Sequence, residues 1–144
     1  MVTGATSGIG KATAKYFAKK GYNVILTGRR AEQLELIKSK LNSKYGAKVQ
    51  SLCFDVTDRQ ACEKAVDGLD AGWEIIDILI NNAGGARGLE PIQEGRPEDW
   101  EYMIDANVKG LLYMSRLIAP GMVKRGKGHI INICSTAGHE VYPN

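Results

Sequence analysis

The stretch that decides the fold is TGATSGIG, Thr3 to Gly10. Its three glycines stand between a very short apolar segment, residues 1–3, and a segment whose apolar residues recur at helical spacing. Glycine allows a tight turn and close backbone approach to a diphosphate, and the first N–H groups of the following helix face such an anion. The spacing differs from the GxGxxG fingerprint, so the glycines alone leave an ordinary turn open as an alternative. The candidate phosphate-binding residues are Gly4, Thr6, Ser7, Gly8, Ile9 and Gly10.

Beyond this turn the apolar period alternates between helical and strand-like. Helices are predicted over residues 9–17 with Gly21 as the C-terminal cap, over 34–41, over 61–69 and over 98–119, where Pro120 is expected to end or kink the helix. Strands are predicted over residues 23–28, 49–54, 75–82 and 129–134, and the first, third and fourth of these are expected to be buried. The segment from Gly84 to Pro97, rich in glycine and proline, is predicted to be a loop over a site.

Strands separated by helices of about 12 or more residues require right-handed crossovers and a parallel sheet with helices on both faces. The predicted fold is therefore α/β, a doubly wound parallel sheet of the Rossmann type in three layers, forming a single domain over residues 1–144. Only residues 1–3 precede the glycine turn, so the strand that should be central is expected to be clipped.

Composition narrows the class of protein. The 144 residues are 44% hydrophobic and 24% charged, which is typical of a globular chain. No apolar run is long enough to span a membrane and no signal peptide is recognised, so a soluble, cytoplasmic protein is expected. The net charge of +3 is scattered, which argues against a nucleic-acid partner. The cysteines at 53, 62 and 134 form no CxxC pair, so we expect mostly packed, reduced thiols, Cys134 in the core, and no metal site.

Five motifs occur in a characteristic order: TGATSGIG at 3–10, DVTD at 55–58, NNAG at 81–84, NVKG at 107–110 and NICSTAG at 132–138. In order and spacing the chain resembles the short-chain dehydrogenase/reductase family over essentially its whole length. The segments ILTGRR, GLEP, DWEYMID and PGMVKRGKGHIINICSTAG are similar to the NADP-dependent members that oxidise serine, allo-threonine and other 3-hydroxy acids.

The cofactor type is predicted from the end of the second strand. Dinucleotide folds that prefer NAD place an acidic residue there, to bind the ribose hydroxyls. This chain has Gly28 followed by Arg29 and Arg30. Guanidinium groups bind a 2′-phosphate through charge-assisted hydrogen bonds, whereas a carboxylate repels it, so NADP is predicted. The alternative is a pair of solvated arginines that open a helix.

The resemblance implies further cofactor contacts. The carboxylate of Asp55 would accept a hydrogen bond from the adenine amino group, and the backbone of Val56 would lie along the ring; the alternative for Asp55 is capping the next helix. Asn82, Ala83 and Gly84 would let the backbone approach the cofactor at the end of a strand.

Two residues are predicted to take part in catalysis. Asn107 lies inside a predicted helix, where asparagine is unfavourable, and the resemblance implies that it bends the helix and holds a water that passes protons; surface exposure is the alternative. Ser135 follows the last strand, and the resemblance implies that it hydrogen-bonds the oxygen of a small-molecule substrate. Asn81 is expected to stabilise the sheet instead of the cofactor.

The family's tyrosine and lysine, spaced YxxxK, would fall beyond Asn144, and Tyr142 lies too close to Ser135 to replace that tyrosine. The domain is thus expected to be incomplete at both ends. The resemblance implies an NADP-dependent oxidoreductase that is a homo-oligomer, a dimer or a tetramer, in its full-length form. The alternatives are a non-catalytic NADP-binding protein and a reductase of another carbonyl or alcohol substrate.

Overall fold

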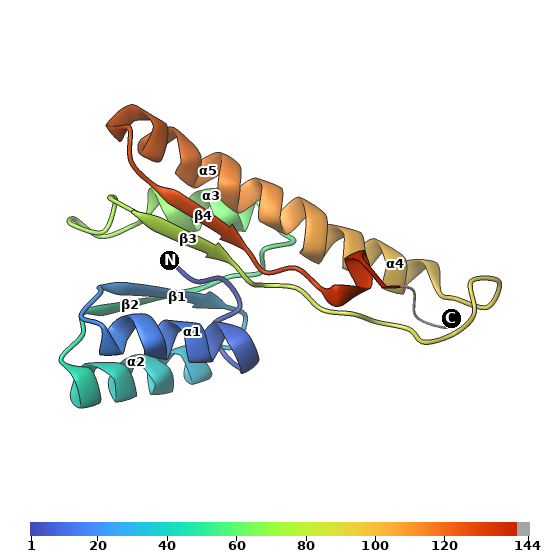
Figure 1. The fold of residues 1–144 in the computed structure, drawn as a ribbon, viewed down its shortest axis with the longest axis horizontal. Coiled ribbons are helices and arrows are strands. Elements are labelled where there is room, and N and C mark those ends of the chain that lie inside the picture. Colours follow the sequence, from blue (N-terminus) through green and yellow to red (C-terminus); the bar gives the residue numbers. More distant parts are fainter. Residues whose placement is uncertain (141–144) are drawn as a thin grey trace.

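The computed structural model describes residues 1–140, which alternate between helices and strands (Figure 1). The strands are β1 (Val24–Gly28), β2 (Val49–Cys53), β3 (Ile78–Asn81) and β4 (His129–Asn132). The helices are α1 (Gly8–Lys19), α2 (Ala31–Tyr45), α3 (Arg59–Asp67), α4 (Pro97–Ile104) and α5 (Gly110–Arg125). Two shorter turns are the π-helical segment η1 (Asp105–Lys109) and the 3-10 segment η2 (Thr136–Gly138).

The strands form two parallel pairs, β1 with β2 and β3 with β4. Val2 lies between the pairs and forms a parallel bridge to Leu26 on one side and to Ile80 on the other. The order across the sheet is therefore β2, β1, the segment Met1–Thr3, β3, β4, and the amino terminus lies in the middle of the fold (Figure 1). The segment Met1–Thr3 therefore occupies the predicted central position of the sheet.

This central segment is hydrogen-bonded along both edges. On the β1 side the Val2 amide donates to Ile25 O at 2.9 Å, and the Thr27 amide donates to Val2 O at 3.0 Å. On the β3 side the Thr3 amide donates to Ile80 O at 3.0 Å, and the Ile80 amide donates to Met1 O at 2.9 Å. Three residues thus join the two strand pairs.

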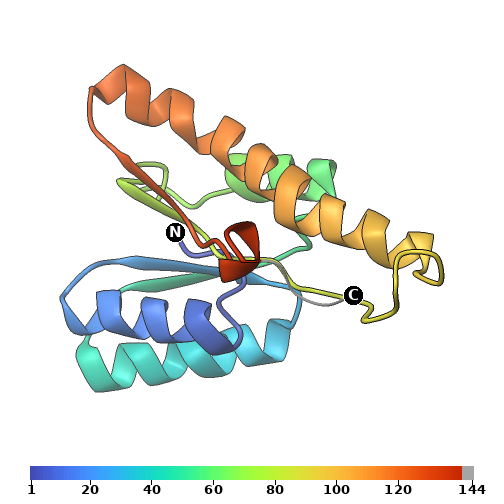
Figure 2. The same ribbon diagram turned by 45° about the vertical axis from the view of Figure 1, so that its right-hand side comes forward.

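The sheet has an apolar cluster on each face. Helices α1 and α2 cover one face with side chains such as Ala14, Leu34 and Ile37, which pack with Leu26. Helices α3 and α5 cover the other face, where Met114 packs in the second cluster (Figure 2). The two faces are buried by different helices, which confirms the predicted doubly wound, three-layered fold.

Helix α1 ends as predicted, since Gly21 has a φ of +82° just beyond it. The long helix differs from its prediction: it runs from Pro97 through η1 to Arg125, and Pro120 lies inside it. Pro120 is exposed, so the helix carbonyl that lacks an N–H partner there can be met by water. The helix ends instead at Gly126, with a φ of +63°.

Two strand predictions were too long. β3 begins at Ile78, and Ile75 is 65% exposed, because the neighbouring segments pair with this strand only from Ile78 onward. β4 ends at Asn132 and is exposed or half-buried, so the predicted buried strand is wrong in its burial. β4 pairs with β3 alone among the described residues, which makes it the edge of the sheet.

The cysteine prediction holds for one residue of three. Cys62 is fully buried, and burial raises the pKa of its thiol to about 11, with nearby Asp58 acting in the same direction. Cys53 and Cys134 are exposed, so Cys134 is not the core residue expected. Cys134 follows β4, whose edge position leaves it uncovered. Across residues 1–140 no helix has the length and apolar content needed to cross a membrane, nor do three His, Cys, Asp or Glu side chains gather as metal ligands.

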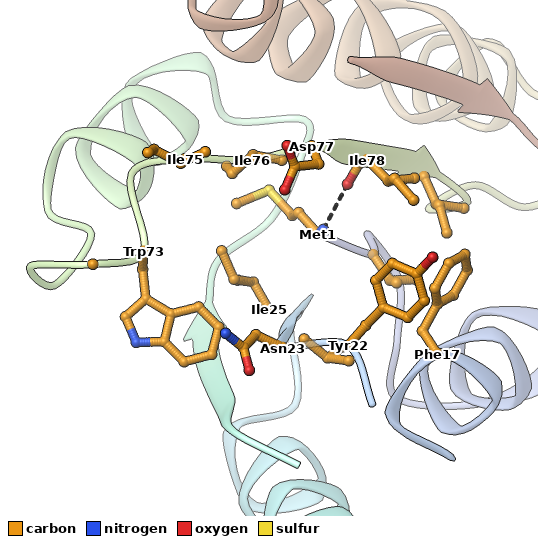
Figure 3. Close-up of a pocket in the computed structure, with 14 residues that line it drawn as sticks. Met1, Phe17, Tyr22, Asn23, Ile25, Trp73, Ile75, Ile76, Asp77 and Ile78 are labelled. Carbon is orange, nitrogen blue, oxygen red and sulfur yellow. Dashed lines mark hydrogen bonds between the residues drawn. The ribbon is translucent and has the colours of Figure 1, made fainter. Parts of the chain in front are cut away.

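The amino terminus lies against a cavity of about 170 Å³ at the end of the sheet remote from the glycine turn. Figure 3 shows Met1 among Ile25, Trp73 and Ile76, with its amino nitrogen bonded to Ile78 O at 2.8 Å. Burial lowers the pKa of this amino group from 8.0 to about 5, although the charge of Asp77 acts in the opposite direction. Where Met1 is the first residue of a polypeptide, the fold therefore holds this amine in its neutral form at pH 7.

In a polypeptide that begins at Met1, this amine makes stability depend on pH. Between pH 8 and pH 5 the unfolded chain binds a proton that the folded chain excludes, so the free energy of unfolding falls as the pH falls. A shift of about three units corresponds to a loss of about 4 kcal/mol across that window, and the loss levels off below pH 5. Urea unfolding at several pH values measures it.

The control is the same chain acetylated at Met1, whose amide N–H keeps the donor to Ile78 O but cannot be protonated. Its stability should lack this part of the pH dependence. Identical pH profiles for the free and acetylated chains would contradict the burial of a neutral amine.

Candidate functional site

A pocket of about 530 Å³ opens at the carboxyl ends of the strands. In doubly wound sheets this is the edge at which ligands bind. Of the predicted cofactor residues, all except Gly10 line it: Gly4, Thr6, Ser7, Gly8, Ile9, Arg29, Arg30, Asp55, Val56, Asn82, Ala83 and Gly84. The predicted catalytic residues Asn107 and Ser135 do not line it, and Tyr142 lies outside the described residues.

The first turn of α1 faces this pocket without a protein cap. Ser7 occupies the N-cap position but its side chain makes no capping hydrogen bond, and no acidic residue lies in the first turn. The Lys11 amide is bonded to Ser7 O at 3.1 Å, so the amides of the three preceding residues lie ahead of the first helical bond. Gly8 has a φ of +53°, and the space where a Cβ would stand is open. These features suit a diphosphate anion.

Gly10 does not line the pocket, and the structure shows a packing role for it. A Cβ there would lie 2.5 Å from Gly4 O and closer still to Asn82 Nδ2. Gly4, at a φ of +64°, would itself crowd Ala83 Cα at 2.9 Å. The two glycines therefore allow the turn, the helix and the end of β3 to touch one another.

Thr3 and Asn82 fasten the glycine turn to β3. The Thr3 hydroxyl oxygen accepts hydrogen bonds from the amides of Asn82 and Ala83, each at 2.9 Å. The Asn82 side-chain amide donates to Thr3 O at 2.9 Å and to Gly4 O at 3.3 Å. Thr3 is 2% exposed, so these bonds form away from water. Thr3 was not predicted from the sequence, because a threonine in a strand does not indicate that its hydroxyl will accept hydrogen bonds from two backbone amides.

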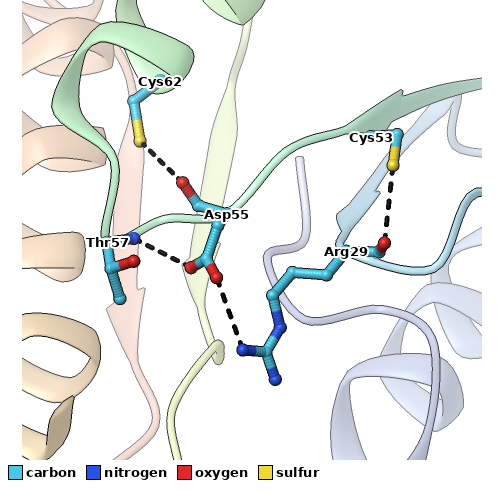
Figure 4. Close-up of polar contacts among 5 residues, drawn as sticks. All are labelled: Arg29, Cys53, Asp55, Thr57 and Cys62. Atoms are coloured by element: carbon cyan, nitrogen blue, oxygen red, sulfur yellow. Dashed lines mark hydrogen bonds and ion pairs between the residues drawn. The ribbon is translucent and has the colours of Figure 1, made fainter.

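The two arginines have different surroundings. Arg30 donates to the Thr6 hydroxyl at 2.7 Å and to the Ser7 hydroxyl at 3.0 Å, so its guanidinium is tethered beside the turn. Arg29 forms an ion pair with Asp55 at 3.3 Å (Figure 4). The pKa of Arg29 is raised, first by the phenol of Tyr102 and then by Asp55. Neither side chain is simply a solvated arginine at the start of a helix.

Asp55 does not cap the next helix, which was its alternative role. Asp58 caps α3 by accepting from the Ala61 amide at 3.1 Å, whereas Asp55 accepts from the Thr57 amide at 3.0 Å (Figure 4). Partial burial raises the pKa of Asp55, but the hydrogen bonds from Thr57 and the charge of Arg29 outweigh it, so the net shift is downward. An ionised carboxylate is thus held at the pocket, able to accept a hydrogen bond.

Asn107 lies in the π-helical turn η1 and is exposed, as the alternative supposed, yet its side chain makes two hydrogen bonds. Its Oδ1 accepts from the Gly85 amide at 2.9 Å and its Nδ2 donates to Gly85 O at 2.9 Å. This pair attaches the chain leaving β3 to the long helix. A π-turn is a common mark of a functional site within a helix.

Ser135 and Asn81 make contacts outside the pocket. The exposed Ser135 accepts from the Ala137 amide at 3.1 Å and so caps η2. Asn81 donates to Ser115 Oγ at 3.0 Å and to Asn132 Oδ1 at 2.9 Å, which confirms that it stabilises the sheet. Tyr102, on α4, lines the pocket although no sequence motif indicated it.

Comparisons with known proteins agree with this geometry. Residues 1–144 match the family model described as short chain dehydrogenase. An NADP-dependent 3-hydroxy acid dehydrogenase of Salmonella typhi is 51% identical over 142 residues, which make up 99% of this chain and 56% of that protein. The chain thus spans 56% of the length of this curated relative.

Two solved structures are similar over the whole fold. Serine dehydrogenase from Escherichia coli matches with a TM-score of 0.92 and 49% identity, covering 99% of this chain and 64% of that one. A closed form of serine dehydrogenase complexed with NADP+ matches with a TM-score of 0.91 and 48% identity, covering 99% of this chain and 56% of that one.

Replacing Thr3 tests the two hydrogen bonds that its hydroxyl accepts from the amides of Asn82 and Ala83. Thr3→Val keeps the shape but leaves the Asn82 and Ala83 amides without their acceptor, so the free energy of unfolding should fall by about 2–4 kcal/mol. Thr3→Ser keeps the hydroxyl and should lose less. Urea denaturation measures both, and equal losses for the two variants would show that the hydroxyl is unimportant.

Proposed function

The chain belongs to the short-chain dehydrogenase family, and from this we propose that it forms the NADP(H)-binding part of an oxidoreductase. The observation that carries the proposal is the pocket at the carboxyl ends of the strands, where the uncapped start of α1 lies beside a guanidinium already held in place. The NADP-dependent relative and the serine dehydrogenase complexed with NADP+ support the choice of cofactor.

The residues of this pocket fit the parts of NADP. The amides at the start of α1 would bind the diphosphate, and Arg30 would bind the 2′-phosphate from its tether on Thr6 and Ser7. The ionised Asp55 would accept a hydrogen bond from the adenine amino group, beside the backbone of Val56. When bound, NADP supplies the nicotinamide carbon that accepts or donates a hydride.

Two further residues would act on the substrate side. We propose that Ser135 hydrogen-bonds the substrate oxygen and that Asn107 holds a water that passes protons. The support for Asn107 is its place in a π-helical turn, where it fixes the backbone at Gly85. The support for Ser135 is its position just after β4, close in sequence to Ile133, which lines the pocket.

We propose a small 3-hydroxy acid or hydroxy amino acid, such as serine or allo-threonine, as the substrate of the whole protein. The names of the similar proteins, a 3-hydroxy acid dehydrogenase and serine dehydrogenases, support this class. We also propose a cytoplasmic homo-oligomer, a dimer or a tetramer. The support for an interface is a row of exposed apolar side chains along the long helix, Ile104, Val108 and Leu112.

The activity is tested by following NADPH formation at 340 nm with the whole protein and a panel of 3-hydroxy acids. Turnover of serine or another 3-hydroxy acid with NADP, and not with NAD, is expected. If only an unrelated alcohol is oxidised, the proposed substrate class is wrong, but the proposed type of reaction stands. NADP binding with no turnover of any alcohol or carbonyl would identify a non-catalytic binding protein.

Arg30→Ala should weaken NADPH binding by about 10- to 100-fold, since a hydrogen bond to a charged group contributes about 1.5–3 kcal/mol, and should leave NADH binding nearly unchanged. Arg29→Ala should have a smaller effect, because Arg29 is engaged by Asp55. Titrations of NADPH and NADH fluorescence give both dissociation constants. Arg116→Ala removes an exposed guanidinium outside the pocket and is the control. Tighter binding of NADH than of NADPH by the unsubstituted chain would overturn the assignment.

A further inference from the structure

A third arginine, Arg87, lies beside the pocket over the ring of Tyr102. The Arg87 guanidinium carbon is 3.4 Å from the centre of that ring, which is stacking distance. Arg87 belongs to the loop between β3 and α4, whereas Tyr102 belongs to α4. Of the two residues, only Tyr102 lines the pocket.

The loop that carries Arg87 is fastened to the long helix at neighbouring points. Gly85 makes its two backbone hydrogen bonds with Asn107. The Arg87 amide donates to Met103 Sδ at 3.4 Å, adjacent in sequence to the stacked ring. Arg87 is therefore held close to Tyr102 by its backbone as well as by its side chain, and the stack is part of a bound segment.

On the pocket side, Tyr102 faces the residues expected to hold adenine. The Arg29 guanidinium carbon lies 6.0 Å from the centre of the Tyr102 ring, and Arg29 is paired with Asp55 at 3.3 Å. The Tyr102 ring thus lies beside the ion pair of the predicted adenine site. Arg87 lies over this ring but is absent from the pocket lining, so Arg87 does not cover the part of Tyr102 that lines the pocket.

We propose that Tyr102 is the aromatic wall on which the adenine ring of NADP stacks, and that Arg87 is a positioning residue that holds this wall. The proposal rests on the proposed function, because it needs NADP in the pocket. Stacking of a base on an aromatic ring strengthens binding by about 5- to 150-fold. Arg87 acts through the ring: it lies on Tyr102 and is absent from the pocket lining, so it need not touch the cofactor.

The test measures dissociation constants of the chain and its variants for NADPH, NADH and 2′,5′-ADP, by fluorescence and calorimetry. Tyr102→Ala should weaken all three by about 10-fold, because all three contain adenine, whereas Tyr102→Phe should stay within about 2-fold of the unsubstituted chain. Arg87→Ala should weaken all three by about 3-fold, and Arg87→Lys should restore part of the loss. In the Tyr102→Ala background, Arg87→Ala should have no further effect.

Arg116→Ala is the matched control, and circular dichroism checks that each variant is folded. A loss that Arg87→Ala causes for NADPH but not for NADH would mean that Arg87 contacts the 2′-phosphate directly, and would overturn the positioning role. Unchanged 2′,5′-ADP binding in Tyr102→Ala would overturn the stacking role while NADP binding stands. If the unsubstituted chain binds neither NADPH nor 2′,5′-ADP, the proposed function itself fails.

Discussion

The structure depends on the backbone hydrogen bonds of a three-residue strand. Met1–Thr3 pairs with β1 on one side and β3 on the other, and the two halves of the sheet are joined through it. The Thr3 hydroxyl extends this junction by accepting the amides that follow β3. Because the glycine turn begins at the next residue, the pairing that joins the sheet also sets where the turn lies. The position of the pocket therefore depends on how Met1–Thr3 pairs with β1 and β3.

The charges around the pocket are arranged before any ligand is present. Arg30 is tethered by two hydroxyl groups of the glycine turn, so its guanidinium is fixed with little need for reorganisation. Arg29 is paired with Asp55, whose pKa is raised by partial burial but lowered more by the hydrogen bonds from Thr57 and by the charge of Arg29. Among the described residues Arg30 therefore has no carboxylate partner in the pocket, whereas Arg29 belongs to a neutral pair. The net positive charge at this edge comes from Arg30, on the side where the turn presents its amides.

The sequence predicted the alternation of elements and the site at the strand ends, because both follow from local patterns: apolar period, glycine spacing and the two arginines. It failed where tertiary pairing decides. Ile75 looked like strand but lacks neighbours to pair with, and Cys134 looked like core but follows an edge strand. Pro120 was expected to end or kink the helix, but α5 continues past it to Arg125, since the exposure of Pro120 lets water satisfy the backbone. Tyr102 could not be predicted, since its position depends on where α4 lies beyond the carboxyl ends of the strands.

The π-helical turn at Asp105–Lys109 has a consequence for the rotational phase of the long helix. Each residue of an ordinary helix turns the chain by about 100°, and a π-turn holds more residues in one revolution. The turn therefore sets the angle between two working faces, one carrying Tyr102 to the pocket and the other carrying Met114 and Ile118 into the core. Losing one residue from this turn would leave the core face in place and rotate the pocket face away from it. The alignment of the pocket face with the core face of the helix thus depends on the number of residues in η1.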